Sequence, residues 1–305
     1  MAKNINGQFT YAINNCFQEG MDKHSIKSNE GNNMGYRIYS YSEKFRVKEM
    51  GKMLQRYFKE NDIKIRQVKD IKAEHIQAFL NSKIENCTQN TVNTYAQSIF
   101  KLQEVCNKTY KNCNIDWRDH IEIPKTLNKT DINRGVGSVI GRDDYDKILA
   151  YTKNNYSETG QAIRLQDQLG IRVEEIANIK IKNIDLTEGK IILENTKGGR
   201  VLVRELTPIA TEIIRETLDK KQNNSDRLFS IKGSSINKQL NRIQDKLGIQ
   251  RHSNHDIRRL IAQEYYDKAR ANGDSKKVAA DKTSIWLNHN QGREILLKTS
   301  YIVIR

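Results

Sequence analysis

The chain has 305 residues, with 52 Lys and Arg against 37 Asp and Glu, and therefore a formal net charge of +15. This length predicts two domains rather than one. The basic excess is shared, because residues 1–140 hold 22 basic and 15 acidic residues and residues 141–305 hold 30 and 22. Two basic bodies favour a polyanion such as DNA as the partner, with a basic soluble enzyme as the alternative.

The composition also excludes several classes of protein. No run approaches the ~18 apolar residues of a membrane helix, and residues 1–15 lack the apolar centre of a signal peptide, so we expect a cytoplasmic protein with no membrane partner. The cysteines form no CxxC pair and no zinc spacing with a histidine; they are Cys16, Cys87, Cys106 and Cys113. This pattern predicts reduced thiols and no metal site.

Helical periodicity dominates the first part of the chain. Apolar residues recur at helical spacing in four segments, 8–18, 45–60, 73–85 and 91–106. Thr91 is the candidate N-cap of the last helix, and residues 22–38 are predicted to form a loop. We therefore predict a helical domain at 1–125, with residues 1–40 as a candidate N-terminal extension, followed by a linker at 126–140.

Beyond the linker, a hairpin pattern interrupts the helices. Two β-branched runs, residues 190–194 and 200–206, are joined by the segment NTKGG, which predicts a β-hairpin. Helices are predicted at 143–154, 157–169, 173–180, 208–221, 234–247, 256–271 and 276–287, with a short one before Tyr301. The second domain, residues 141–305, is therefore expected to be mainly α with a small antiparallel β-sheet.

The run LGIRVEEI at residues 169–176 resembles the first arginine box of the tyrosine recombinases, the integrase family of phages and mobile elements. In that family a hairpin lysine, a His-x-x-Arg motif, a second histidine and a C-terminal tyrosine follow in this order. The matching residues here are Arg172, Lys197 in TKGGR, His255 and Arg258 in HDIRR, His289 in WLNHN and Tyr301 in KTSYI. The resemblance covers residues 141–305, whereas the first domain resembles the family's core-binding domain only in placement and helix content.

This resemblance implies both a fold and a reaction. The fold is a two-domain DNA clamp, with a helical core-binding domain and an α+β catalytic domain. The reaction is site-specific cleavage and rejoining of DNA strands through a covalent 3′-phosphotyrosine, for integration or excision of a mobile genetic element. No cofactor is expected, because the covalent intermediate conserves the ester bond. The implied partners are double-stranded DNA with specific recombination sites, a homo-tetramer on that DNA, and accessory DNA-bending or directionality proteins, which would associate the protein with the nucleoid.

The resemblance also assigns a chemical role to each matching residue. Tyr301 is the nucleophile, and Arg172 and Arg258 stabilise negative charge on the nonbridging phosphate oxygens. Lys197 is the candidate general acid for the leaving 5′-oxygen. A free tyrosine has a pKa of about 10, so at neutral pH Tyr301 needs help in losing its proton, from the arginines, a histidine or the phosphate itself. His255 is the expected base or donor.

Five neighbouring residues carry secondary expectations. His289 is expected to hydrogen-bond a nonbridging oxygen, and Glu175 to orient a catalytic side chain. Arg259 replaces the family's usual histidine and is a candidate phosphate contact. Asn288 replaces the family's usual glycine and is expected to adopt the left-handed conformation. Trp286 is expected to pack in the core, with a hydrogen bond to the phosphate as the alternative.

Other interpretations stay open. Taken singly, each of these residues has an ordinary structural role as a salt bridge, turn, cap or core residue. A metal site at His255, Asp256 and His289 is a further alternative without a supporting spacing. The chain as a whole has two alternatives, a DNA-binding protein without activity and a type IB topoisomerase-like enzyme that nicks and reseals one duplex. Residues 302–305 are expected either to add a strand to a sheet edge or to fray.

Overall fold

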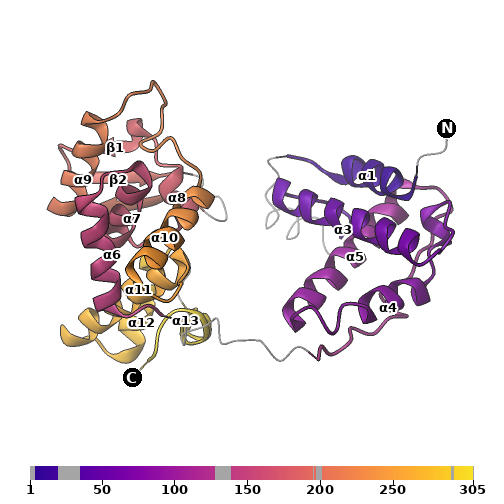
Figure 1. The fold of residues 1–305 in the computed structure, drawn as a ribbon. Coiled ribbons are helices and arrows are strands. Elements are labelled where there is room, and N and C mark those ends of the chain that lie inside the picture. The colour runs from indigo at the N-terminus through magenta and orange to yellow at the C-terminus, as the bar shows by residue number, and fades with distance from the viewer. Residues whose placement is uncertain are drawn as a thin grey trace. The chain divides into compact units, whose positions relative to one another are not determined.

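The computed structural model of the chain describes residues 4–19, 35–127, 139–194, 196, 201–289 and 292–304. It divides the chain into two compact units, Met1–Ile132 and Asn133–Arg305 (Figure 1). The division falls inside the predicted linker at 126–140, of which residues 128–138 lie outside the described part. Most of the predicted loop at 22–38 also lies outside it.

The described residues of the first unit form a small helical bundle (Figure 1). Its helices are α1 (Ile5–Cys16), α3 (Tyr41–Glu60), η2 (Val68–Asp70), α4 (Ala73–Asn81) and α5 (Gln89–Thr109). Helices α1, α3 and α5 pack on one another around a core that includes Phe9 and Leu54. The four predicted α-helices are present. The predicted cap is wrong, however, because α5 begins one turn earlier and Thr88 Oγ1 accepts from the backbone N–H of Thr91.

The second unit is built around one buried helix, α7. The α-helices of this unit are α6 (Arg142–Asn154), α7 (Glu158–Leu169), α8 (Val173–Ala177), α9 (Pro208–Asp219), α10 (Gly233–Leu247), α11 (Asn254–Ala271), α12 (Lys276–Trp286) and α13 (Glu294–Ser300). Helix α7 contacts α6, α8, α9, α10 and α11, and most of its residues are buried. Such a helix is central to the core. The C-terminal end of α7 therefore lies among several helices. Arg172 follows three residues after Leu169, the last residue of α7.

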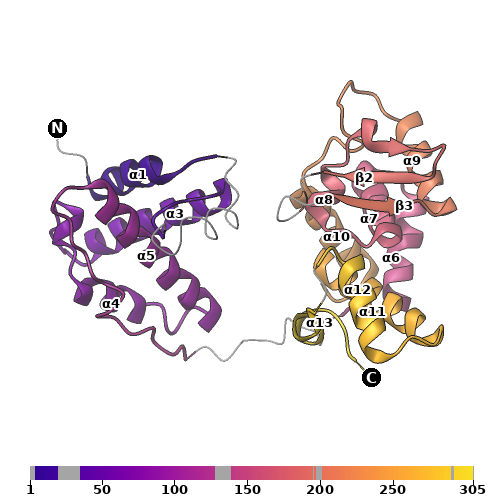
Figure 2. The ribbon, with the colours of Figure 1, turned by 180° about the vertical axis from the view of Figure 1, so that it is seen from behind.

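A three-stranded antiparallel sheet completes the second unit (Figure 2). Its order is β1 (Ile184–Asp185), β2 (Lys190–Leu193) and β3 (Leu202–Glu205), with η4 (Ile181–Asn183) before β1. In β2, Ile191 and Leu193 face the core, as the period of two requires. The predicted fold class, mainly α with a small antiparallel sheet, is confirmed. Strand β1 was not predicted, because two residues carry no periodic signal.

Helices α11, α12 and α13 gather toward the end of the unit opposite the sheet (Figures 1 and 2). They share a separate apolar cluster that includes Leu297, Tyr301 and Ile302. Ile302 is fully buried, and the backbone N–H of Val303 donates to Gln263 Oε1 at 2.7 Å. The segment after Tyr301 therefore packs on α11 of its own chain, so the expectation of a frayed end is wrong for residues 302–304, as is that of a strand added to its own sheet. Addition of a strand to a neighbouring subunit stays a prediction. No helix in the described part of the chain has the length and apolar character to cross a membrane.

Candidate active site

The site is centred on Arg258 and Tyr301. Arg258 lies one turn into α11 and is 1% exposed, whereas Tyr301 directly follows α13 and is 5% exposed. Arg258 Nη1 donates to Tyr301 Oη at 3.1 Å. The guanidinium also lies 5.5 Å from the centroid of the tyrosine ring. The structure thus places a buried guanidinium directly on the phenol oxygen.

The other donors of Arg258 are held by main-chain carbonyls. Nε donates to the carbonyl of Gly170 at 2.9 Å, and Nη2 to the carbonyl of Leu287 at 2.6 Å. These two bonds orient the guanidinium plane, so that Nη1 points at the tyrosine. Burial lowers the pKa of Arg258 to about 10, which leaves it cationic at neutral pH.

Two histidines flank the tyrosine ring. The ring centroids of His255 and His289 lie 5.2 Å and 5.4 Å from that of Tyr301. His255 precedes Arg258 by three residues on α11, so both lie on one face of that helix. Partial desolvation and the positive charges of Arg259 and Arg258 lower the pKa of His255 to about 4. At neutral pH His255 is therefore uncharged, and one ring nitrogen can accept a hydrogen bond or a proton.

His289 is positioned by the turn that ends α12. Asn288 has φ of 58° in this turn, which confirms the predicted left-handed conformation. Asn288 Nδ2 donates to Thr196 Oγ1 at 2.7 Å, and Thr196 is buried. This bond joins the residue before His289 to the residue before Lys197. Lys197 itself lies outside the described residues.

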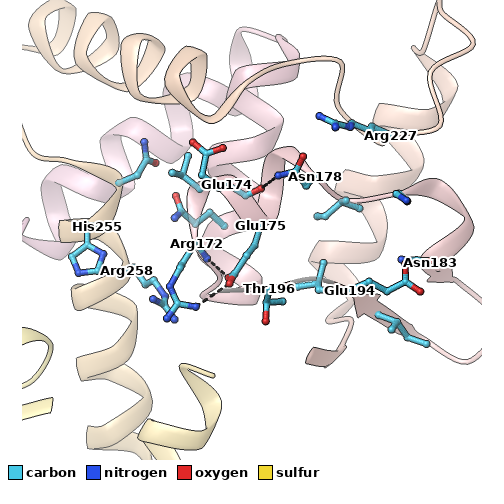
Figure 3. Close-up of a pocket in the computed structure, with 17 residues that line it drawn as sticks. Arg172, Glu174, Glu175, Asn178, Asn183, Glu194, Thr196, Arg227, His255 and Arg258 are labelled. Atoms are coloured by element: carbon cyan, nitrogen blue, oxygen red, sulfur yellow. Dashed lines mark hydrogen bonds and ion pairs between the residues drawn. The ribbon is translucent and has the colours of Figure 1, made fainter. Parts of the chain in front are cut away.

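Arg172 is oriented by Glu175 within a single turn. Arg172 is the N-cap of α8, and its backbone N–H donates to Glu175 Oε2 at 2.8 Å. The side chain follows the same partner, because Arg172 Nη1 donates to Glu175 Oε1 at 2.9 Å (Figure 3). Glu175 is buried, so its carboxylate is also a counter-charge inside an arginine-rich site. This geometry is the one expected for a carboxylate that orients a catalytic arginine.

A cavity of about 610 Å³ opens beside these groups (Figure 3). Arg172, His255 and Arg258 line one part of it, and Arg227 lines the opposite part in the view of Figure 3. Thr196 at the root of the hairpin is also in its lining. The two arginines and the first histidine of the motif set therefore share one concave surface, as a bound phosphate requires.

Arg259 and Asp256 hold the chain before the tyrosine. Arg259 Nε donates to the carbonyl of Ser300 at 2.7 Å, and its Nη1 forms an ion pair with Asp256. Asp256 in turn closes the capping box at the start of α11 with Ser253. In this structure Arg259 fixes the residue that precedes Tyr301, and a phosphate contact by Arg259 stays a prediction. Within the described residues, no group of three or more His, Cys, Asp or Glu side chains is placed to hold a metal ion.

Arg204 was missed by sequence reasoning. It lies on β3, and its Nε donates to the carbonyl of Leu169 at 3.2 Å. Leu202, Arg204 and Leu206 share one side of the strand by the period of two, and Leu202 is buried. A charged residue in an inward-facing series of leucines was the signal that could have identified it.

Trp286 packs beside Arg204 and has the role expected of a core residue. Its ring stacks on that of Tyr265, with centroids 4.6 Å apart and an interplanar angle of 13°. The Arg204 guanidinium lies 5.2 Å from the Trp286 ring centroid. The same ring also occupies the space that a side chain at position 170 would need.

The comparisons with known proteins agree with this geometry. Residues 138–278 match the family model described as the phage integrase family. Over 87 residues the chain is 31% identical to the tyrosine recombinase XerA of Saccharolobus solfataricus, a stretch that covers 28% of this chain. The chain spans only about 30% of the length of that curated relative. The second unit thus carries a region that matches the phage integrase family, over somewhat less than half of the chain.

Solved structures extend the likeness to most of the chain at the level of the fold. The XerH site-specific recombinase bound to its difH substrate gives a TM-score of 0.65 at 16% identity, over 93% of this chain and 88% of that one. A lambda integrase tetramer bound to a Holliday junction gives 0.58 at 15%, over 88% and 74%. The Tn1549 transposon integrase in complex with a circular intermediate DNA gives 0.53 at 9%, over 96% and 94%. The family match ends before His289 and Tyr301, so the placement of these two residues rests on the geometry above.

Proposed function

We propose that this chain is a site-specific DNA recombinase of the integrase type, which cleaves and rejoins DNA through a covalent 3′-phosphotyrosine during integration or excision of a mobile genetic element. The observation that carries the proposal is the 3.1 Å hydrogen bond from Arg258 Nη1 to Tyr301 Oη, between two histidine rings. A tyrosine with only a structural role needs no buried cation on its oxygen. The match of residues 138–278 to the phage integrase family supports the same reaction.

The cleavage step follows from the placement of these groups. Tyr301 Oη forms a bond to the phosphorus as the bond to the 5′-oxygen breaks, and neutral His255 takes up the phenol proton. Arg172 and Arg258 stabilise the charge that develops on the nonbridging oxygens, with a hydrogen bond from His289. Lys197 delivers a proton to the departing 5′-oxygen. Attack by a 5′-hydroxyl on the phosphotyrosine reverses each transfer and rejoins the strand, so no cofactor takes part.

Arg258 can serve the tyrosine and the phosphate at once. Nε donates its one hydrogen to a carbonyl and Nη2 donates one of its two to another, and Nη1 donates one of its two hydrogens to Tyr301 Oη. The second hydrogen is available to a nonbridging oxygen. Tyr301 is only 5% exposed and does not line the cavity, whereas Arg258 does, so the proposal requires the scissile phosphate to approach the phenol from the Arg258 side.

The partners follow from the same reaction. Exchange of two duplexes requires four cleavages, so we propose a homo-tetramer on double-stranded DNA that carries specific recombination sites. The lambda integrase neighbour was solved as a tetramer on a Holliday junction, which supports this assembly. The two units would form a clamp on DNA. We further propose that the protein is cytoplasmic and associated with the nucleoid, and that accessory DNA-bending or directionality proteins take part. Binding should weaken steeply with salt, because the net charge is +15 and the contacts are to phosphates.

The test is capture of the covalent intermediate. The protein is incubated in EDTA with nicked duplexes from the DNA that flanks its own gene, then denatured and analysed for a protein–DNA adduct. Cleavage close to the nick releases a short fragment that carries the 5′-hydroxyl. Because this fragment dissociates, the strand cannot be rejoined and the adduct persists. We expect an adduct that forms without metal and disappears in Tyr301→Phe and Arg172→Ala.

The matched control is Tyr266→Phe. Tyr266 is 1% exposed on α11, and its hydroxyl has no hydrogen-bond partner in the described structure, so its removal tests loss of a buried hydroxyl away from the reaction. DNA binding without an adduct at any site would favour the binding protein without activity. An adduct that yields relaxed circles but no recombinant joints would favour the topoisomerase-like enzyme.

A further inference from the structure

The C-terminal ends of α7 and α12 meet at the site, and Arg258 bridges them. The last carbonyls of an α-helix lack partners within the helix. Arg258 donates to the carbonyl of Gly170, directly after α7, and to the carbonyl of Leu287, directly after α12. It thus gives one carbonyl at the end of each helix a hydrogen-bond partner. A cation at a helix C-terminus is also favoured by the helix dipole.

Arg204 makes the same kind of bridge one residue earlier on each helix. Its Nε donates to the carbonyl of Leu169 at 3.2 Å, and its Nη2 donates to the carbonyl of Trp286. Consecutive carbonyls of α7 are therefore joined to consecutive carbonyls of α12 by two guanidinium groups. One guanidinium comes from α11 and the other from the hairpin strand β3.

The bridged ends lead directly to groups of the active site. Arg172 follows Gly170 by two residues, and His289 follows Leu287 by two residues. A change in the spacing of the two helix ends would therefore move both a phosphate-binding arginine and a phosphate-binding histidine. In the described structure the hydrogen bonds of Arg204 go to main-chain carbonyls and not to Tyr301, so the contacts support an effect on the reaction through other residues.

The surroundings of Arg204 restrict its side chain further. The guanidinium lies against the ring of Trp286, which stacks on Tyr265 of α11. Burial lowers the pKa of Arg204 to about 10, and the negative charge of Glu175 favours the cationic form. Arg204 is thus a fixed cation at neutral pH, with a stacking partner and three carbonyl partners, since its Nη1 also donates to the carbonyl of Val203 at 3.4 Å.

We propose that Arg204 is a positioning residue of the cleavage step, which sets the spacing between the Arg172 turn and His289 through the two helix ends. This inference rests on the proposed function. A lysine at position 204 would keep the charge but present a point-like ammonium group, which lacks the planar fork that spans two carbonyls. A displacement of about 1 Å at a reacting group can slow a reaction about 100-fold, so we expect Arg204→Lys to lower the cleavage rate roughly 10- to 100-fold.

The experiment is single-turnover cleavage of the nicked duplex over a range of protein concentrations. A positioning role predicts a lower rate at saturating protein and an unchanged half-saturating concentration for DNA. Arg204→Gln removes the charge as well and should be slower still. All assays are run below the unfolding transition of every variant, measured by circular dichroism, so that loss of folded protein is not read as loss of rate.

Arg142→Lys is the matched control. Arg142 lies in the same unit and also uses a guanidinium fork, because its Nε and Nη2 donate to Glu264 Oε1 and Oε2 at 2.8 Å each. Its Nη1 also contacts Asp167 Oδ1 at 3.3 Å in the last turn of α7. In the described structure, however, Arg142 donates to none of the four carbonyls that Arg204 and Arg258 bridge, so its variant should lose stability and keep its cleavage rate.

Each outcome decides the inference. The inference is supported if Arg204→Lys has a lower cleavage rate with unchanged affinity for DNA, while Arg142→Lys keeps the wild-type cleavage rate. A wild-type rate in Arg204→Lys overturns the inference and leaves the proposed function intact, as does an equal loss of rate in Arg142→Lys. Absence of an adduct from the wild-type protein on every flanking duplex overturns the proposed function, and this inference with it.

Discussion

Gly170 is the residue whose replacement tests the packing of the site most directly. It ends α7 with φ of 60°, in the left-handed region, and the ring of Trp286 occupies the space where a Cβ would lie. A residue with a side chain loses about 1–2 kcal/mol in this conformation. A methyl group forced into a filled space costs about 1–3 kcal/mol more. We therefore expect Gly170→Ala to lower the free energy of unfolding of the second unit by about 2–5 kcal/mol.

Gly248→Ala is the control that separates the two contributions. Gly248 ends α10 with φ of 67°, but no atom lies within 4 Å of the place where its Cβ would be. Its replacement should cost only the conformational part, about 1–2 kcal/mol. The difference between the two variants measures the clash with Trp286.

Native-state hydrogen exchange read by mass spectrometry is the suitable assay, because peptides from α7 and α10 report on the second unit within the intact chain. Both glycines end helices of that unit, so the two losses are compared within one folded body. Equal losses for Gly170→Ala and Gly248→Ala would refute the packing argument. Gly170→Ala should also slow cleavage, because the carbonyl of Gly170 holds Arg258.

Substitutions at three other positions probe the surroundings of the tyrosine. Asn288→Ala should lower the free energy of unfolding by about 2–3 kcal/mol in chemical denaturation, because alanine tolerates the left-handed φ poorly and cannot bond to Thr196. Asn288→Gly keeps the tolerance of this φ and should lose only the contribution of the hydrogen bond. Ile302→Ala should lower the unfolding free energy by about 2–4 kcal/mol, because Ile302 is fully buried, and a loss under ~0.5 kcal/mol would contradict the packed tail. The pKa of His255 is about 4 in the folded chain and 6.5 ordinarily, so only the unfolded chain binds a proton there between these values. The stability contributed by neutral His255 is thus present above pH 6.5 and lost as the pH falls toward 4. His255→Gln should therefore flatten the dependence of the unfolding free energy on pH between these values, measured by urea unfolding.

Local features of the chain were predictable from the sequence, because they depend on neighbours along the chain. The helices of both units follow the helical spacing of apolar residues, and the β2–β3 hairpin follows its β-branched runs. The left-handed Asn288 was expected from its place at a helix end. The ordered motif set also pointed to the residues that line the site, because each motif stands at the end or start of an element.

The tertiary structure alone decided how these residues meet. Arg258, Gly170 and Leu287 lie far apart in the chain, and only the packing of α7, α11 and α12 brings their atoms within hydrogen-bond distance. The same packing places Tyr301 against Arg258 and buries Ile302, neither of which a periodic pattern encodes. The motif set, through its resemblance to the tyrosine recombinases, thus predicted which chemistry this chain carries. The distances that make the chemistry work depend on contacts between distant segments, since they form only when the core closes.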